Sequence, residues 1–163
     1  FIPYIEKMLD IEIEDNDKLR EVDEKFVSPS KVDKKFYQEL EKVFENDKFT
    51  IENTERLIHS HGQETFKDIY KVLYRSIDRL VDLVFYPESE EDVRKIIEIA
   101  LKYNVCLIPY GGGTNVTRAL SVPENEKRTV VSIDTRRLSK IECINKEELR
   151  VCDEAGINGK KIF

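Results

Sequence analysis

The 163-residue chain has few of the residues that build metal sites and disulfide frameworks. Its three cysteines, Cys106, Cys143 and Cys152, are odd in number and show no CxxC spacing. This pattern argues against a disulfide scaffold and a structural zinc site, and it favours a reducing or neutral compartment. The two histidines, His59 and His61, suggest a metal pair or a general base. They have no acidic or cysteine partner at ligand spacing, so a metal site is not expected.

The chain also lacks long apolar runs and an excess of basic residues. No segment approaches the ~18 consecutive apolar residues that a membrane-spanning helix needs. The net charge of −6 disfavours a general nucleic-acid binder, so we expect no nucleic-acid partner. With 40% hydrophobic and 37% charged residues, the composition suits one folded domain rather than a membrane bundle or a disordered tail.

Charge and apolar character divide the chain into two parts. Residues 1–60 hold 16 of the 33 acidic and 10 of the 27 basic residues, so they carry the whole net charge. Apolar residues become dense after about residue 80. We therefore predict an α+β fold, with a mostly helical leader over residues 1–79 and an α/β unit over residues 80–163. The ends, Phe1 and Phe163, lack the marks of complete termini, so we expect a piece of a longer protein.

Three amphipathic helices are expected in the leader, and all three predict core packing. Ser30 is expected to cap the first. Asn53 is expected to cap a second, short helix from Thr54 to Ile58. A third apolar stripe runs from Phe66 to Ile77. The stripe of the first helix consists of Val32, Phe36, Leu40, Val43 and Phe44.

The second half alternates between strands and a helix. Strands are predicted over residues 81–86, 105–109 and 129–133. A helix between the first two is expected to begin after Ser89, with acidic residues in its first turn, and to end at Asn104. A strand–helix–strand unit of this kind is typical of a right-handed parallel crossover. The predicted buried stripe of the helix consists of Val93, Ile96, Ile97, Ala100 and Leu101.

A pair of short strands is predicted over residues 141–144 and 149–152. Cys143 and Cys152 fall on these strands, where thiol packing is preferred to a disulfide. Cys106 falls in the predicted strand over residues 105–109 and is expected to be a small buried hydrophobe.

One loop, residues 109–116 with the sequence PYGGGTNV, carries the sharpest motif. Three consecutive glycines free the backbone amides to point into one concavity and receive phosphate oxygens, and Thr114 and Asn115 add side-chain donors. A glycine triplet is also typical of a plain flexible turn, but its place at the carboxyl end of a parallel-type strand favours ligand binding. Because it is neither GxGxxG nor followed by GK[ST], it predicts neither a Rossmann fingerprint nor a P-loop.

Several motifs in order give the chain a family resemblance. They are PESEEDV at residues 87–93, the glycine loop, the Ile133-Asp134 pair and EAGI at residues 154–157. Over residues 80–163 the chain resembles the FAD-binding domain of the vanillyl-alcohol-oxidase, or p-cresol-methylhydroxylase (PCMH), type. Within that superfamily it resembles the alkyldihydroxyacetonephosphate synthases. The features that carry this second likeness are His61-Gly62, Arg79-x-x-Asp82 and Lys102-Tyr103-Asn104.

The resemblance implies non-covalent FAD. No histidine or cysteine lies within residues 109–121, so a covalent tether from this loop is not expected. Asn115 stands where the family more often has serine. Tyr110 stands where a small or aliphatic residue is common, and it is expected to pack over the adenine or to face solvent. Arg118, just past the loop, is expected on the surface, and the alternative is contact with a phosphate of FAD or substrate. The residues implied to contact FAD are Pro109, Tyr110, Gly111, Gly112, Gly113, Thr114 and Asn115.

The resemblance also implies an activity. An enzyme of this kind replaces the acyl group of acyl-dihydroxyacetone phosphate by a long-chain fatty alcohol, forming the ether bond of ether lipids, with FAD as an electron sink and no net redox change. The family's catalytic tyrosine and histidine cluster would lie beyond residue 163, so no catalytic residue is expected here and the chain alone should be inactive. Peroxisomal location, peripheral membrane association and a homodimer are further expectations from the family.

Two other functions remain open at this point. One is an FAD-linked dehydrogenase of a 2-hydroxy acid such as lactate or glycolate, and the other is a non-catalytic binding module. His61 is expected to be structural or at the substrate entrance. The basic pairs Lys127-Arg128 and Arg136-Arg137 are expected to lie in solvated turns.

Overall fold

The computed structural model describes residues 2–10, 12, 27–62, 77 and 79–159. The third predicted leader stripe, from Phe66 to Ile77, therefore lies almost entirely outside the described residues. The helices are α1 (Ile2–Leu9), α2 (Lys34–Val43), α3 (Asn53–Ile58) and α5 (Glu90–Tyr103), with short 3-10 turns at Asn46–Lys48 and Thr135–Arg137. The strands are β1 (Phe49–Thr50), β2 (Leu83–Phe85), β3 (Cys106–Tyr110), β4 (Val130–Asp134), β5 (Ile141–Asn145) and β6 (Arg150–Asp153). The predicted α+β fold is confirmed.

Four strands form one sheet in the order β1-β2-β4-β3. β2 and β3 both run parallel to β4, which lies between them, and β1 pairs antiparallel with β2. The predicted parallel strand–helix–strand unit is thus present, with β4 inserted between its two strands. Because parallel strands share one carboxyl edge, Tyr110 at the end of β3 lies beside Asp134 at the end of β4.

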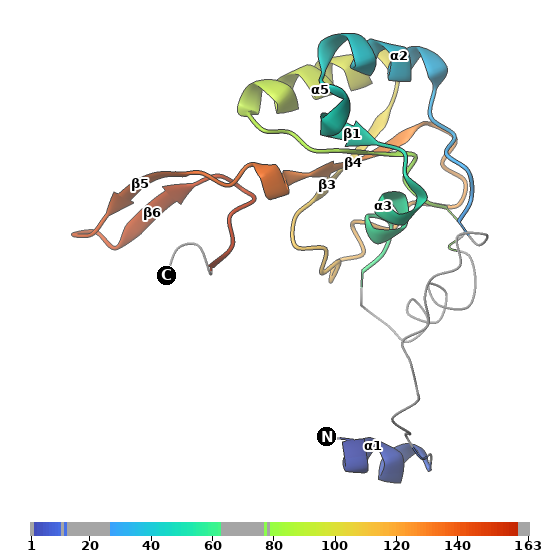
Figure 1. The fold of residues 1–163 in the computed structure, drawn as a ribbon, viewed down its shortest axis with the longest axis vertical. Helices are drawn as coiled ribbons and strands as arrows, with labels where there is room; N and C mark the ends of the chain where they lie inside the picture. The colour runs from blue at the N-terminus through green and yellow to red at the C-terminus, as the bar shows by residue number, and fades with distance from the viewer. Residues whose placement is uncertain (1, 11, 13–26, 63–76, 78, 160–163) are drawn as a thin grey trace.

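Helices α2 and α5 cover one face of this sheet (Figure 1). Helix α5 begins and ends as its sequence predicts. The Ser89 hydroxyl accepts a hydrogen bond from the Asp92 amide at 3.2 Å, and Asn104 ends the helix in the left-handed conformation, with φ 54°. The core between helices and sheet contains Phe36, Leu40, Phe44, Phe49, Leu83, Phe85, Ile96, Ile99, Val131 and Ile133.

The predicted buried stripe of α5 is wrong at two positions. Ile97 and Leu101 are 44% and 78% exposed, whereas Ile99 is buried. The buried face is centred on Ile96, Ile99 and Ala100, which are spaced three and four residues apart and so lie on one side of a 3.6-residue turn. The prediction placed this face about one residue too far along the helix.

Two predicted helix caps are also wrong. Asp33, not Ser30, caps α2, because its Oδ1 accepts from the Phe36 amide at 2.8 Å. Ser30 instead donates its hydroxyl to the Asp82 carbonyl at 2.7 Å. Asn53 is the first residue of α3 rather than its cap, and its Oδ1 accepts from Arg56 Nη1 at 3.1 Å.

The segment before β2 is joined to the sheet by a buried ion pair. Arg79 donates to both carboxylate oxygens of Asp82, at 2.9 and 2.6 Å. The same carboxylate accepts from the amides of Lys31 and Val130, each at 2.9 Å. Asp82 therefore links residues before α2 to the start of β4. The division of the chain at residue 79 stays a prediction.

Strands β5 and β6 form the predicted hairpin, which extends away from the rest of the structure (Figure 1). Cys143 lies opposite Cys152 and both are free, so the preference for thiols over a disulfide is confirmed. Both are exposed, so neither thiol is packed in a core. Cys152 instead donates its thiol to Glu142 Oε2 at 3.2 Å. Cys106 is only partly buried. None of the helices in the described ranges is both long and apolar enough to cross a membrane.

Candidate functional site

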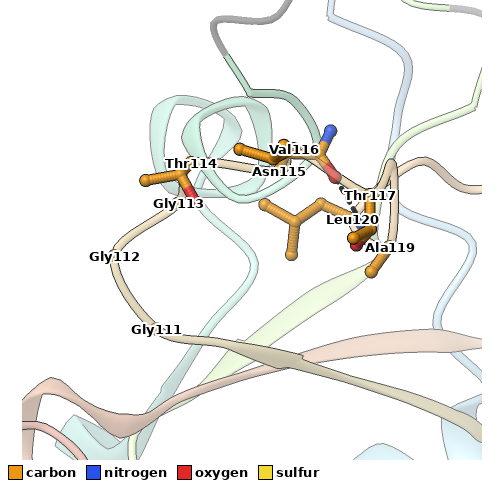
Figure 2. Close-up of a pocket in the computed structure, with 9 residues that line it drawn as sticks. All are labelled: Gly111, Gly112, Gly113, Thr114, Asn115, Val116, Thr117, Ala119 and Leu120. Carbon is orange, nitrogen blue, oxygen red and sulfur yellow. Dashed lines mark hydrogen bonds between the residues drawn. The ribbon is translucent and has the colours of Figure 1, made fainter.

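The glycine loop leaves the carboxyl end of β3 and curves around a shallow cavity of about 230 Å³ (Figure 2). This volume is below the ~300–1,000 Å³ of a pocket that encloses a whole small-molecule ligand, so it suits one part of a larger ligand. The lining residues are Gly111, Gly112, Gly113, Thr114, Asn115, Val116, Thr117, Ala119 and Leu120.

The glycines leave room and donors for an anion. A Cβ on Gly111 or Gly112 would meet nothing within 4 Å, so the space beside the backbone is open. Within the part of the chain that the structure describes, no backbone carbonyl accepts from the amides of Gly112, Gly113 or Thr114. Amides without a partner beside an open space are the donors that bind phosphate oxygens in such loops. The loop therefore fits a pyrophosphate group.

Asn115 holds the loop in shape. Its side-chain Oδ1 accepts from the Leu120 amide at 2.8 Å (Figure 2), and its carbonyl accepts from the Arg118 amide at 2.9 Å. Asn115 is buried and has φ 55°, a left-handed conformation that asparagine adopts more readily than most residues. Its oxygen is thus used inside the loop.

The His61-Gly62 pair lies against this loop. A Cβ on Gly62 would overlap the Asn115 Cβ and lie 3.0 Å from the Thr114 carbonyl oxygen. Glycine is needed here because the two backbones approach so closely. The imidazole of His61 is only partly buried, and its Nδ1 lies 3.3 Å from the Gly62 carbonyl oxygen.

A cluster of polar side chains lies beside Tyr110, the residue that precedes the loop. His59 is completely buried; its Nε2 lies 2.7 Å from Asp134 Oδ2, and its Nδ1 lies 2.7 Å from the Glu55 carbonyl oxygen. Arg136 donates to Asp134 through Nε at 2.6 Å and through its amide at 2.8 Å. Tyr86 donates its hydroxyl to Glu55 at 2.5 Å.

Two pKa shifts follow from this arrangement. Burial by itself would raise the pKa of Asp134, but the hydrogen bond from His59 and the amide and charge of Arg136 outweigh it and hold that pKa below its usual value. Burial, together with the neighbouring Glu55 carboxylate, raises the pKa of Tyr86, so its hydroxyl stays a proton donor.

Tyr110 belongs to this cluster rather than to the cavity lining. Its ring centroid lies 4.3 Å from that of His59, and a Cβ on Gly113 would overlap its hydroxyl oxygen. Tyr110 is partly buried, so it does not simply face solvent, and its expected packing over the adenine stays a prediction. Burial raises the pKa of Tyr110, which keeps its hydroxyl neutral.

The other predicted site residues divide between the cavity and its surroundings. Gly111 to Asn115 line the cavity, whereas Pro109 pairs with Ile133 inside the sheet. Arg118 is exposed, as expected. That the seven predicted residues contact FAD stays a prediction.

The two basic pairs differ from each other. Arg136 and Arg137 lie in the 3-10 turn Thr135–Arg137, and the Arg136 side chain is 54% exposed, so the solvated-turn interpretation of this pair is confirmed. Arg136 nevertheless also donates to the buried Asp134, and Arg137 donates to Glu88 Oε1 at 2.9 Å. Arg128 is exposed and pairs with Glu126, which agrees with that interpretation.

The sequence suggests His59 only as part of a metal pair or as a general base. Among the described residues no group of three or more potential ligands forms a metal site. The available signal for its real contacts was the Ile133-Asp134 motif at the end of a strand beside Tyr110, which places a carboxylate at the carboxyl edge.

Comparison with known proteins decides the family. The family model described as "FAD binding domain" matches residues 81–163. The chain belongs to this family. FAD is therefore its cofactor, and the open amides of the glycine loop fit the pyrophosphate of that group.

Curated relatives refine this likeness. The chain is 44% identical over 114 residues to an alkyldihydroxyacetonephosphate synthase of Caenorhabditis elegans, which is 70% of this chain and 19% of the relative. It is 34% identical over 136 residues to the enzyme of the same name from Dictyostelium discoideum, covering 83% and 22%. A mitochondrial D-lactate dehydrogenase (cytochrome) of Arabidopsis thaliana is 29% identical over 126 residues, covering 77% and 20%. The chain spans about a fifth of the length of these relatives.

Solved structures agree on the fold. A structure of alkyldihydroxyacetonephosphate synthase superposes with a TM-score of 0.81 at 29% identity, covering 98% of this chain and 31% of the other. A p-cresol methylhydroxylase structure superposes with a TM-score of 0.61 at 14% identity, covering 82% and 25%. The second likeness shows the fold alone, and it agrees with the predicted PCMH-type domain.

Proposed function

We propose that the protein containing this chain is an FAD-dependent transferase that replaces the acyl group of acyl-dihydroxyacetone phosphate by a long-chain fatty alcohol. The observation that carries the proposal is the 44% identity to a synthase of that name over a segment that includes an FAD-type glycine loop. Bound FAD supplies the electron sink for this exchange. The catalytic groups are proposed to lie outside residues 1–163.

The residues of this chain have a holding role in that reaction. The amides of Gly112, Gly113 and Thr114 donate to the pyrophosphate, and the absence of side chains at Gly111 and Gly112 lets it approach. Asn115 keeps these amides in place through its bond to the Leu120 amide. Binding at a preformed loop needs little ordering, which favours tight retention of the cofactor.

The lactate dehydrogenase alternative is supported by a weaker likeness. Its Arabidopsis representative is 29% identical, against 44% and 34% for the two synthases. Both enzyme classes would use the same glycine loop, so the loop does not separate them. The two enzyme classes differ in their substrates, so the experiment must offer the substrates of both classes.

A turnover assay on the full-length protein tests the proposal. Acyl-dihydroxyacetone phosphate and a labelled long-chain alcohol are supplied, and labelled ether product is expected. Reduction of an electron acceptor by lactate or glycolate, without ether product, would move the protein to the dehydrogenase class. Absence of both reactions and of flavin absorbance would support a non-catalytic binding module. The Gly112→Val variant is the matched control, because it should lose flavin and product together.

We also propose the setting of the reaction. Both substrates carry long alkyl chains, which favours peripheral association with a membrane that supplies them. Peroxisomal location and a homodimer rest on the family resemblance. Imaging of the tagged full-length protein and its elution on size exclusion, each against a soluble monomeric control, test these two statements.

A further inference from the structure

The glycine loop rests on one aromatic side chain. Tyr110 is the last residue of β3, immediately before Gly111, and the position of its hydroxyl leaves no room for a Cβ on Gly113. Its ring therefore reaches from the start of the loop to the third glycine. Gly113 has φ 68°, a conformation that the loop needs for its curvature. The place of the Tyr110 ring is thus coupled to the shape of the loop.

His59 fixes that ring. The two rings are tilted by 46° with centroids 4.3 Å apart, a contact distance for aromatic pairs. The imidazole is itself held on both sides, because an oxygen acceptor lies 2.7 Å from each nitrogen. One acceptor is the Glu55 carbonyl on α3 and the other is Asp134 on β4. The orientation of His59 is therefore set by two elements that do not touch the cavity.

We propose that His59 is a positioning residue for the cofactor loop, and that it holds Tyr110 against Gly113 so that the amides of Gly112–Thr114 stay open for the FAD pyrophosphate. The inference rests on the assignment of this loop to FAD. A loop that is ordered before binding loses less conformational freedom when the ligand arrives, so its affinity is higher. Without the His59–Tyr110 contact the loop must be ordered by FAD itself.

The chemistry of the cluster suits positioning and not reaction. His59 is fully buried and all its ring nitrogens have partners, so it offers no free atom to a ligand. Asp134 is equally buried and is shared by His59 and Arg136. Of His59, Asp134 and Tyr110, only Tyr110 adjoins the loop in sequence. His59 therefore influences FAD binding through Tyr110.

The experiment measures FAD affinity of the full-length apoprotein by quenching of flavin fluorescence, beside the melting temperature of the same apoprotein. His59→Gln keeps a donor for Asp134 but removes the ring, and Tyr110→Leu removes the partner ring. Each is expected to weaken FAD binding about tenfold. The double variant is expected to bind no more weakly than either single variant, because both remove the same contact. Tyr110→Phe keeps the ring and should restore affinity to within about twofold of the parent.

A matched control and two contrary results make the test decisive. Arg94→Gln changes an exposed residue of α5, which lies outside both the cluster and the loop, and should leave FAD binding unchanged. Unchanged affinity in His59→Gln and Tyr110→Leu, or losses that simply multiply in the double variant, would overturn the proposal. If His59→Gln does not fold, Tyr110→Leu and Tyr110→Phe test the same contact from the less buried side. Gly112→Val tests the assignment of the loop to FAD separately from the role of His59. If this variant retains FAD, the assignment of the loop to FAD is wrong.

Discussion

Gly62 and Asn115 pack so closely that no side chain fits between them. A Cβ on Gly62 would overlap the Asn115 Cβ and approach the Thr114 carbonyl oxygen to 3.0 Å. Asn115 is the residue that closes the glycine loop, because its Oδ1 accepts from the Leu120 amide. The segment that follows α3 therefore forms a floor for the loop, and its shape depends on a glycine.

The first prediction concerns this floor. Gly62→Ala should lower the free energy of unfolding by about 1–3 kcal/mol, the usual effect of overpacking a site that cannot expand. It should also weaken FAD binding, because the loop backbone at Thr114 must move to admit the methyl group. Urea unfolding and FAD titration of the full-length protein measure the two effects. Gly159→Ala is the control, since a Cβ there meets nothing within 4 Å. If neither the free energy of unfolding nor the FAD affinity changes in Gly62→Ala, the segment after α3 moves aside without cost.

The second prediction concerns the cavity side of the loop. Gly112→Val places a side chain into space that is empty of protein atoms, so the apoprotein should keep its melting temperature. The same side chain should block the approach of the pyrophosphate and reduce flavin content at least tenfold, measured from absorbance after gel filtration. Gly159→Val is the matched control for a new β-branched residue. A Gly112→Val protein with normal flavin content would contradict the assignment of this loop to FAD.

Sequence reasoning placed the loop correctly because its signals are local. An apolar run followed by glycines marks the carboxyl end of a strand. At the ends of α5, the Ser89 hydroxyl accepts from the Asp92 amide, and the Asn104 amide donates to the carbonyls of Ala100 and Leu101. These residues act on neighbours three to five positions away. Patterns of that range are visible in a single sequence.

The supporting cluster was missed because its contacts are long-range. His59 and Asp134 meet across 75 positions of the sequence, and neither residue type predicts the other. The two wrong helix caps have a similar cause. Ser30 is drawn to the Asp82 carbonyl, which only the folded sheet brings near, so its capping propensity is overruled by a tertiary hydrogen bond.

The third prediction concerns the buried ion pair. Asp82→Ala leaves the Arg79 guanidinium and the amides of Lys31 and Val130 without their acceptor. Removing one partner of a buried pair typically destabilises by about 3–5 kcal/mol. Urea unfolding of the full-length protein measures this effect. The contrasting variant is Arg94→Gln on the exposed side of α5, whose ion pairs lie in solvent and should contribute little. Similar unfolding curves for both variants would show that Asp82 is not a structural anchor.

The fourth prediction concerns acid stability. His59 and Arg136 keep the pKa of Asp134 below the value of 3.8 that the unfolded chain has, so the unfolded chain takes up this proton first as the pH falls. The stabilisation by Asp134 is therefore fully present above about pH 4 and is lost as the pH falls through the folded pKa. Asp134→Asn should be less stable than the parent at neutral pH, and its stability should fall less steeply between about pH 4 and pH 2. Thermal melting of the full-length protein across this range measures both slopes. The control is Glu147→Gln, in the exposed turn of the β5–β6 hairpin, and its stability should follow that of the parent at every pH. If the stability of Asp134→Asn runs parallel to that of the parent between about pH 4 and pH 2, the Asp134 carboxylate contributes nothing to acid stability.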